Sequence, residues 1–389
     1  MNANRRSRLA HDAHTIVVKV GTRVLTDERG YIDPARVAHL ADQLLALRRE
    51  RRVVLVSSGA VAAGMSTLGY ARRPGDLAEL QAVAAVGQAK LIEAYNHEFG
   101  RQTMLVDGQP KVAHAAQVLL GADDFQNRVG YLNVRNTLLR LLQFPHVIPV
   151  INENDTVSVE ELQTTFGDND KLAALVTNLL RAPLLVILST VDGLLDDRGQ
   201  VVPLVEQFDE RILSFVCDQK TGLSKGGMAS KLNNARLCAQ SGETVVIANG
   251  RQENILLRLL AGESVGTLFV PQARPVSPRK RWIGAPATSR GRILVNVGAQ
   301  GAIRESHGSL LAVGIVGVEG EFRKGDVVSL LLAAAGGGAE GKEFARGLTN
   351  YSSADLLRIM GCQSQRIAEI LGHRPYEEVI HRDNMVLLG

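Results

Sequence analysis

Short apolar runs alternate with longer stretches rich in Ala and Leu over the first 270 residues. The short runs are bounded by glycine or polar residues, which is typical of buried strands. Pro149 interrupts one of these runs, so we expect a broken strand there. The expected strands are Thr15–Val20, Val53–Val56, Val118–Leu120, His146–Ile151, Leu184–Leu188 and Thr244–Ala248.

The longer stretches carry apolar residues at helical spacing. Asp33 followed by Pro34 has the form of a helix N-cap with proline at the first helical position. Short strands that alternate with helices predict an α/β fold, with a mainly parallel central sheet sandwiched by helices. The expected helices cover residues 34–52, 75–99, 123–142, 171–180 and 229–240, and a further one opens at 57–60.

The pattern changes after residue 270. Three prolines and the basic run Arg279–Arg281 predict a linker over residues 271–289. Short strand-like runs punctuated by glycine then predict a small β barrel or sandwich over residues 290–389. We expect its strands at 293–297, 310–318 and 326–332, a flexible hairpin tip at 334–340, and short helices at 353–360 and 364–371.

Composition narrows the class of protein. No apolar run approaches the roughly 20 residues of a membrane span, so we expect no membrane partner. Residues 1–13 lack the apolar stretch of a secretory signal and are expected to form a disordered leader before an α/β domain at 14–270. The three cysteines lie far apart, which favours neither a disulfide framework nor a zinc site and fits a cytoplasmic protein.

The net charge of +4 is unevenly placed. Of 44 Lys and Arg and 40 Asp and Glu in the chain, residues 271–389 hold 15 and 11, so the excess lies in the C-terminal part. This mild excess is only a weak pointer towards nucleic acid.

Polar or glycine-bearing breaks follow four of the expected strands. They are Lys19–Thr22, Ser57–Gly59, Asn152–Asp155 and Ser189–Thr190. The carboxyl ends of parallel strands share one edge of a sheet, where ligands of α/β proteins bind. The sequence therefore predicts a ligand site built from these four breaks.

The run Asn152–Asp155 is the most polar of the breaks. Buried amides and carboxylates are costly unless they are hydrogen-bonded, so the run suits a rigid pocket for a small charged molecule. A simple turn remains an equal alternative, since Asn and Asp favour turns. Likewise, Gly167–Asp170 is either part of the site or only the N-cap of the helix that follows.

Candidate anion-binding groups lie near the same strand ends. Glycine at a strand end and a helix N-terminus both offer backbone N–H groups to an anion. Lys19 lies inside an apolar run, and Lys231 follows Lys225–Met228, whereas neither Walker-type nor dinucleotide glycine motifs occur. Fixed cations and N–H groups are what phosphoryl transfer needs. Surface lysines and ordinary glycine turns are the alternatives. No histidine lies in the glycine-bearing stretches, which disfavours Ser-His-Asp hydrolysis.

Together these stretches resemble the glutamate 5-kinases of the amino-acid kinase family, in the family's order and over nearly the whole chain. Related kinases share the lysine–glycine opening but usually differ in the flanking residues. The matching stretches are Val17–Thr22 with Leu25, Val56–Gly64, Leu132–Leu138, Val150–Asp155, Gly167–Asp170, Gly226–Lys231, Val265–Phe269 and Arg279–Trp282.

The C-terminal part is similar to PUA domains, so the resemblance implies an amino-acid kinase fold followed by a small, mostly-β PUA barrel. PUA domains often bind RNA, which implies a weak RNA contact. The matching positions are Gly298–Ala299, Ser309–Ile315, Gly320, Phe322, Gly325–Val328 and Gly347–Tyr351 with Ser353.

The resemblance implies ATP-dependent phosphorylation of the L-glutamate side-chain carboxylate to L-glutamyl 5-phosphate, the first step of proline biosynthesis. It implies that Lys19 and Lys231 stabilise the transferring phosphoryl group and that Asp170 holds both lysines. Magnesium would be carried by the ATP phosphates, without protein ligands of its own. The implied glutamate-binding residues are Ser58, Asn152, Asp155 and Asn169.

The resemblance also assigns a nucleotide site, with a few departures from the family pattern. Thr is common where this chain has Lys225 and Gly121, and the stretch Val106–His114 is longer than usual. The implied ATP-binding residues are Lys19, Ser189, Thr190, Lys225, Gly226, Gly227, Met228, Ala229, Ser230 and Lys231.

Family expectations extend to a homo-oligomer, either dimer or tetramer, and to proline as feedback inhibitor.

Two rival functions stay open. One is an RNA-binding or RNA-modifying protein directed by the PUA-like part, against which stand the zero net charge of the first 270 residues and the 4 % aromatic content. The other is an amino-acid kinase with a different substrate.

Overall fold

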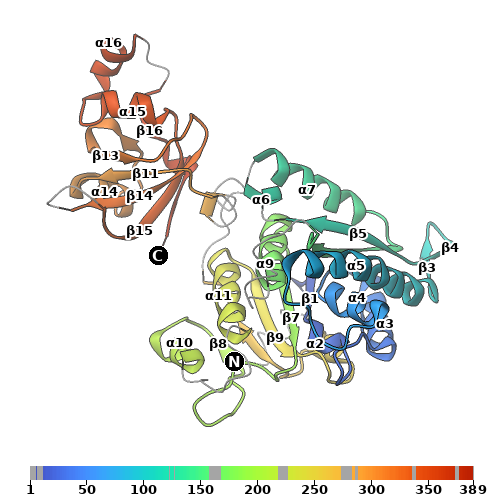
Figure 1. Ribbon diagram of the computed structural model, residues 1–389. Helices are drawn as coiled ribbons and strands as arrows, with labels where there is room; N and C mark the ends of the chain where they lie inside the picture. Colours follow the sequence, from blue (N-terminus) through green and yellow to red (C-terminus); the bar gives the residue numbers. More distant parts are fainter. Residues whose placement is uncertain are drawn as a thin grey trace. The chain divides into compact units, whose positions relative to one another are not determined.

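The computed structural model describes residues 6, 12–121, 123–126, 128–156, 168–217, 227–272, 283–284, 288–334, 339–372 and 376–388. The chain divides into two compact units. The first comprises residues 1–124 and 129–275, and the second comprises residues 125–128 and 276–389. Each unit has a main sheet of its own (Figure 1).

An eight-stranded sheet forms the middle of the first unit, in the order β5-β6-β2-β1-β7-β9-β10-β8. Its pairs are parallel except for β9 with β10, which confirms the predicted mainly parallel sheet. The strands are β1 (Thr15–Val20), β2 (Arg52–Ser57), β5 (His114–Leu120), β6 (Val147–Glu153), β7 (Leu184–Ser189), β8 (Leu204–Val205), β9 (Thr244–Asn249) and β10 (Thr267–Phe269).

Strand β1 lies at the centre of the sheet between β2 and β7. All six of its residues are buried, as expected for a β-branched strand covered on both faces. Val20 at its end pairs with Ser57 of β2 and with Leu188 of β7. The carboxyl ends of these parallel strands therefore meet at one edge, as the sequence predicts.

Helices cover both faces of this sheet (Figure 1). One face packs Ile16, Val18 and Val20 of β1 with apolar residues of α3, α5 and α12 in a common core. Helix α9 contacts β1, β6 and β7, and α11 contacts β9. The helices are α2 (Thr22–Leu25), α3 (Pro34–Arg48), α4 (Ala60–Leu68), α5 (Leu77–Gly100), α6 (Asp123–Gln126), α7 (Arg128–Leu141), α9 (Asp168–Leu180), α10 (Glu210–Cys217), α11 (Gly227–Gln240) and α12 (Ile255–Leu260).

Several element boundaries differ from the prediction. Strand β6 runs through Pro149 without a break and includes Asn152 and Glu153, which the sequence placed after the strand. Helix α3 begins at the predicted cap, where the side chain of Asp33 accepts a hydrogen bond from the Ala35 N–H, but it ends at Arg48 because β2 starts at Arg52. The long stretch 106–114 contains most of a hairpin, β3 (Thr103–Val106) with β4 (Gln109–Val112).

Helices α4 and α5 touch backbone to backbone at two glycines. A Cβ atom on Gly87 would lie 1.8 Å from the carbonyl oxygen of Ala60, and one on Gly64 would lie 1.9 Å from that of Val83. No side chain fits at such distances. The two glycines therefore fix α5 against the first turn of α4, which directly follows the strand end at Ser58 and Gly59.

Arg48 at the end of α3 is 7 % exposed and makes hydrogen bonds only to main-chain carbonyl oxygens in the described part of the chain. Burial lowers the pKa of its guanidinium, and nearby Arg52 lowers it further. The bonds join the end of α3 to the turn between α7 and β6. The four acceptors are the oxygens of Arg51, Leu142, Phe144 and Val147.

Arg6 departs from the expected disordered leader at 1–13. Its side chain is 3 % exposed, and burial lowers its pKa. Its guanidinium donates to the carbonyl oxygens of Pro203, Glu263, Val265 and Gly266. Apart from Arg6, Asp12 and Ala13, the leader lies outside the described residues.

The second unit is mostly β, as predicted. A five-stranded sheet in the order β13-β11-β14-β15-β17 accompanies a short β12–β16 pair. Helix α14 starts at Val297, where the sequence predicted the end of a strand, because Asn296 caps it by accepting from the Ala299 N–H. Part of the expected hairpin tip, 335–338, lies outside the described residues. The elements are β11 (Arg292–Val295), α14 (Val297–Arg304), β12 (Leu310–Leu311), β13 (Ile315–Glu319), β14 (Val327–Ala333), β15 (Ala339–Leu348), α15 (Ser353–Ile359), α16 (Ile367–Leu371), β16 (Glu378–Ile380) and β17 (Met385–Leu387).

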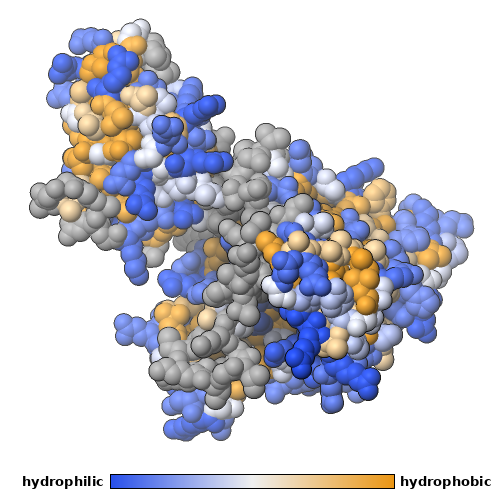
Figure 2. Space-filling model, in the orientation of Figure 1, coloured by the Kyte–Doolittle hydropathy of each residue, from blue (hydrophilic) through white to orange (hydrophobic). Residues whose placement is uncertain are grey.

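Apolar side chains reach the surface of this unit (Figure 2), among them Val297, Val316 and Leu357. The buried polar residues described for it are Ser329 and Thr349, neither of them charged. In the described part of the whole chain, no helix combines the length and apolarity that a membrane crossing requires.

Candidate functional site

A carboxylate joined to two lysines lies at the predicted edge of the sheet. Lys19 is 4 % exposed near the end of β1, and its Nζ lies 2.6 Å from Oδ1 of Asp170. Lys231 in α11 places its Nζ 3.1 Å from Oδ2 of the same residue. Three segments far apart in the sequence are thus brought to one point, and Lys19 is not a solvated surface lysine.

Asp170 is 1 % exposed and lies in the first turn of α9, where the helix dipole favours a negative charge. Burial alone would raise the pKa of its carboxyl. The charges of Lys19 and Lys231, together with their hydrogen bonds, outweigh burial and hold that pKa below its ordinary value. The carboxylate is therefore ionised at neutral pH.

The cluster carries an excess of positive charge. Two ammonium groups share one carboxylate, which leaves a net charge of +1 in a mostly buried position. Lys231 also donates to the carbonyl oxygen of Gly227 at 3.1 Å, which fixes it on the first turn of α11. Such a fixed, poorly solvated charge suits an anion that approaches the helix N-terminus.

The predicted glutamate-binding residues Ser58, Asn152 and Asn169 make hydrogen bonds at the same edge. Asn169 donates from Nδ2 to Oγ of Ser58 at 3.0 Å, which joins α9 to the end of β2. Asn152 donates from Nδ2 to Oε1 of Gln88 at 2.6 Å. The Oδ1 atoms of both asparagines are buried and have no hydrogen-bond partner among the described residues. These unpaired acceptors suit a ligand that donates hydrogen bonds.

The fourth residue, Asp155, lies half-buried just beyond the end of β6. It follows Asn154, whose N–H donates to the carbonyl oxygen of Leu120 at the end of β5. Asn152 and Glu153 of the polar run therefore belong to β6, whereas Asp155 lies in the turn that follows the strand at the sheet edge.

The predicted nucleotide residues fall in two places. Ser189 ends β7, and its carbonyl oxygen accepts from the Gly250 N–H at 2.8 Å; Thr190 follows it. Gly227, Met228, Ala229 and Ser230 form the first turn of α11, directly before Lys231. Lys225 and Gly226 lie outside the described residues.

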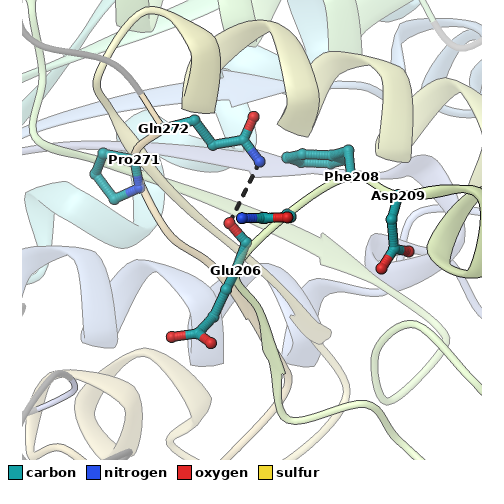
Figure 3. Close-up of a pocket in the computed structure, with 6 residues that line it drawn as sticks. Glu206, Phe208, Asp209, Pro271 and Gln272 are labelled. Atoms are coloured by element: carbon teal, nitrogen blue, oxygen red, sulfur yellow. Dashed lines mark hydrogen bonds between the residues drawn. The ribbon is translucent and has the colours of Figure 1, made fainter.

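A separate cavity of 520 Å³ opens beside β8, the edge strand of the sheet. Figure 3 shows Gln272 facing the main chain of Glu206, to whose oxygen it donates, with Phe208 beside them. The described lining residues include the carboxylates of Glu206 and Asp209, which would repel a phosphate. We therefore do not assign the nucleotide phosphates to it.

No cluster of three or more metal-ligating side chains occurs among the residues that the structure describes.

Two polar residues of α5 beside the site were missed by sequence reasoning. Gln88 contacts Asn152, and Tyr95 lies 2.9 Å from Oγ of Ser57. The only local signal is a glutamine after Gly87 in an otherwise apolar segment.

Comparison with known proteins shows the family of this chain. Residues 14–249 match the amino acid kinase family, and residues 291–371 match the PUA domain. The glutamate 5-kinase of Rhodopirellula baltica is 45% identical over 388 residues, covering 98% of this chain and 96% of the relative. That of Methylococcus capsulatus is 45% identical over 379 residues, covering 96% of each chain. This chain therefore belongs to the amino acid kinase family and, within it, to the glutamate 5-kinases with a C-terminal PUA domain.

A solved structure offers a more distant likeness. Carbamate kinase from Giardia lamblia, bound to AMP-PNP, is 17% identical and has a TM-score of 0.45; the match covers 67% of this chain and 99% of that one.

Proposed function

We propose that this protein transfers the γ-phosphoryl group of ATP to the side-chain carboxylate of L-glutamate, giving L-glutamyl 5-phosphate and ADP in the first step of proline biosynthesis. The observation that supports this best is the carboxylate of Asp170 between Lys19 and Lys231, at 2.6 and 3.1 Å. Membership of the glutamate 5-kinases supports the choice of substrate.

In the proposed step, a carboxylate oxygen of glutamate forms a bond to the γ-phosphorus. The bond from that phosphorus to the oxygen bridging the β-phosphate breaks, and ADP leaves with the electron pair. The nucleophile is already ionised at pH 7, so no general base is needed. Lys19 and Lys231 stabilise the charge on the transferring group, and Asp170 keeps both ammonium groups in place.

The proposed glutamate pocket uses Ser58, Asn152, Asn169 and Asp155. The unpaired Oδ1 atoms of the two asparagines accept hydrogen bonds from the substrate ammonium group, and Asp155 supplies a negative charge for it. Burial of the asparagines, at 1 % and 4 % exposed, strengthens these contacts by excluding water.

The proposed nucleotide site uses Ser189, Thr190, the stretch from Lys225 to Lys231 and Lys19. The first turn of α11 directs unpaired N–H groups and a partial positive charge towards the phosphates. We propose that magnesium enters with ATP and neutralises phosphate charge.

Further parts of the proposal rest on the family resemblance alone. Residues 14–270 form the kinase domain, 271–289 a linker and 290–389 the PUA domain. The protein is a cytoplasmic homo-oligomer that proline inhibits, and its PUA domain makes a weak RNA contact. A gel shift with tRNA fragments at low and high salt tests the RNA contact, because phosphate contacts weaken steeply with salt.

Hydroxylamine trapping tests the reaction. The purified protein is incubated with ATP, magnesium, hydroxylamine and, in separate reactions, L-glutamate, L-aspartate or N-acetyl-L-glutamate, with Lys231→Ala as control. We expect hydroxamate from glutamate only, and its loss in the control.

Each other outcome has a distinct meaning. Hydroxamate from aspartate or acetylglutamate instead would keep the kinase and change the substrate. No hydroxamate with any of the three, from folded protein that shifts RNA, would overturn the kinase in favour of the RNA-binding alternative.

A further inference from the structure

Helix α5 contacts both segments of the proposed glutamate pocket that come from strand ends. Gln88 accepts from Asn152 at the end of β6, and Tyr95 contacts Ser57 at the end of β2. The two α5 residues are seven apart, which is two helical turns, so both project from the same face. Neither is among the residues that the sequence assigned to the site.

The Asn152 amide is oriented with its nitrogen towards Gln88. An asparagine amide can present either its oxygen or its nitrogen to a ligand. The Gln88 Oε1 atom is an acceptor and binds the Nδ2 group of Asn152 at 2.6 Å. That contact leaves Oδ1 of Asn152 unpaired and buried, as an acceptor for a ligand.

The backbone beside Gln88 is held by close packing against α4. Gln88 directly follows Gly87, whose Cα lies against the backbone of α4 so closely that a Cβ would be 1.8 Å from the Ala60 oxygen. Farther along α5, Tyr95 is fully buried, and burial raises the pKa of its hydroxyl, which therefore stays protonated. The Ser57 hydroxyl donates to the Ser58 carbonyl oxygen at 3.0 Å, so the Tyr95 O–H is the donor to Ser57.

We propose that Gln88 is a positioning residue that holds the Asn152 amide with its oxygen available to the substrate, and so selects a substrate with a protonated amino group. The inference rests on the proposed function, because it takes Asn152 to contact glutamate. Asn169, whose Nδ2 is bound by Ser58 and whose Oδ1 is likewise unpaired among the described residues, presents the same polarity. Two acceptors with this orientation disfavour a carboxylate and favour an ammonium group.

The test compares wild type with Gln88→Leu, Gln88→Lys and Gln88→Glu in the hydroxamate assay. Leucine and lysine remove the acceptor, whereas glutamate retains it. We expect KM for L-glutamate to rise about 10- to 100-fold in the first two variants, as for a lost hydrogen bond to a charged group, with kcat within about threefold. Gln88→Glu restores most of the wild-type KM. Gln207→Leu, the same change at an exposed position, serves as the control.

Glutarate, which is glutamate without the amino group, gives a second readout as a competitive inhibitor. We expect the inhibition constant of glutarate to be the same in wild type and Gln88→Leu, because glutarate lacks the ammonium group that would bind Asn152. A merely structural Gln88 would weaken both ligands equally.

Three results would overturn the inference: an unchanged KM for glutamate in Gln88→Leu and Gln88→Lys, an effect on kcat alone, or equal weakening of glutamate and glutarate. If Gln88→Leu does not fold, Gln88→Lys and Gln88→Glu decide between acceptor loss and retention. Failure of the proposed function is distinct, because then wild type itself forms no hydroxamate from glutamate.

Discussion

A buried cation lies at each end of the parallel strands of the eight-stranded sheet, but the groups that bind the two cations differ in kind. Where the strands end, Lys19 and Lys231 share the carboxylate of Asp170. Where they begin, Arg48 donates to four main-chain carbonyl oxygens from the end of α3 and the turn before β6. The same sheet thus offers a direct comparison of two ways to bury positive charge.

The difference separates a structural cation from the cations of the proposed site. The planar guanidinium of Arg48 is surrounded by neutral acceptors that its N–H directions match, so it joins chain segments. The two lysines compete for one carboxylate and retain an excess of charge at the place where helices α9 and α11 begin. Burial alone would have marked Lys19 and Arg48 as equally unusual; the nature of the partner distinguishes them.

The largest expected effect is at the strand-end edge. Lys231→Ala removes half of the cationic pair, and we expect kcat to fall about 10²- to 10³-fold, as when one preorganised group that stabilises a transition state is lost. The free energy of unfolding should change little, because Asp170 keeps Lys19. Steady-state kinetics and urea unfolding measure both. Lys171→Ala, an exposed lysine next to Asp170, is the matched control and should retain wild-type kcat.

Arg48→Met should show the reverse pattern. The change leaves buried carbonyl oxygens without donors, so we expect the free energy of unfolding to fall by about 3 kcal/mol. The kcat and KM of the folded fraction should match wild type. Arg49→Met, an exposed neighbour, is the control. A loss of kcat without a loss of stability would contradict the structural assignment of Arg48. The distinction between Arg48 and the two lysines would then no longer hold.

Tyr95→Phe should have a smaller effect on stability than Arg48→Met. It removes one buried hydrogen bond, to Ser57, and retains the ring that packs at 5.9 Å from Phe99. We expect a loss of about 1 kcal/mol in unfolding free energy, measured by urea titration. A stability equal to wild type would show that Ser57 does not depend on the tyrosine hydroxyl.

The smallest effect concerns pH. Because the folded-state pKa of Asp170 lies below its ordinary value of about 3.9, its pairing stabilises the protein fully above that value and less as pH falls through the folded pKa. Urea unfolding between pH 3 and 6 should show wild type losing stability on acidification, and Asp170→Asn losing less. Equal slopes for the two proteins would refute the pairing as a source of acid sensitivity.

Much of the site follows from the sequence because parallel strands place their ends together. Once the runs at Thr15–Val20 and Leu184–Leu188 are taken as parallel strands, Lys19 and Ser189 must share an edge. The direct contact of Asp170 with both lysines required the family resemblance, since no local pattern joins residues 151 and 61 positions apart.

Other features depend on packing that the sequence does not encode locally. The sequence pattern predicts Arg48 inside a helix that reaches residue 52, whereas its carbonyl partners beyond Arg51 lie 94 to 99 positions away. Gln88 and Tyr95 lie in a long helix rich in Ala and Leu, where the face that meets the site is set by the approach to α4. The unbroken β6 has a similar cause, because pairing with β5 on either side of Pro149 maintains the strand.

The contact between Gly64 and Gly87 also limits how this protein can be recombined. Each glycine fits only the backbone of the opposite helix, so neither helix can be exchanged for a relative's version that places a side chain there. A chimaera that takes residues 60–100 as one block keeps both halves of the contact. A crossover between the two helices keeps it only where the parent that supplies α4 has glycine at 64 and the parent that supplies α5 has glycine at 87.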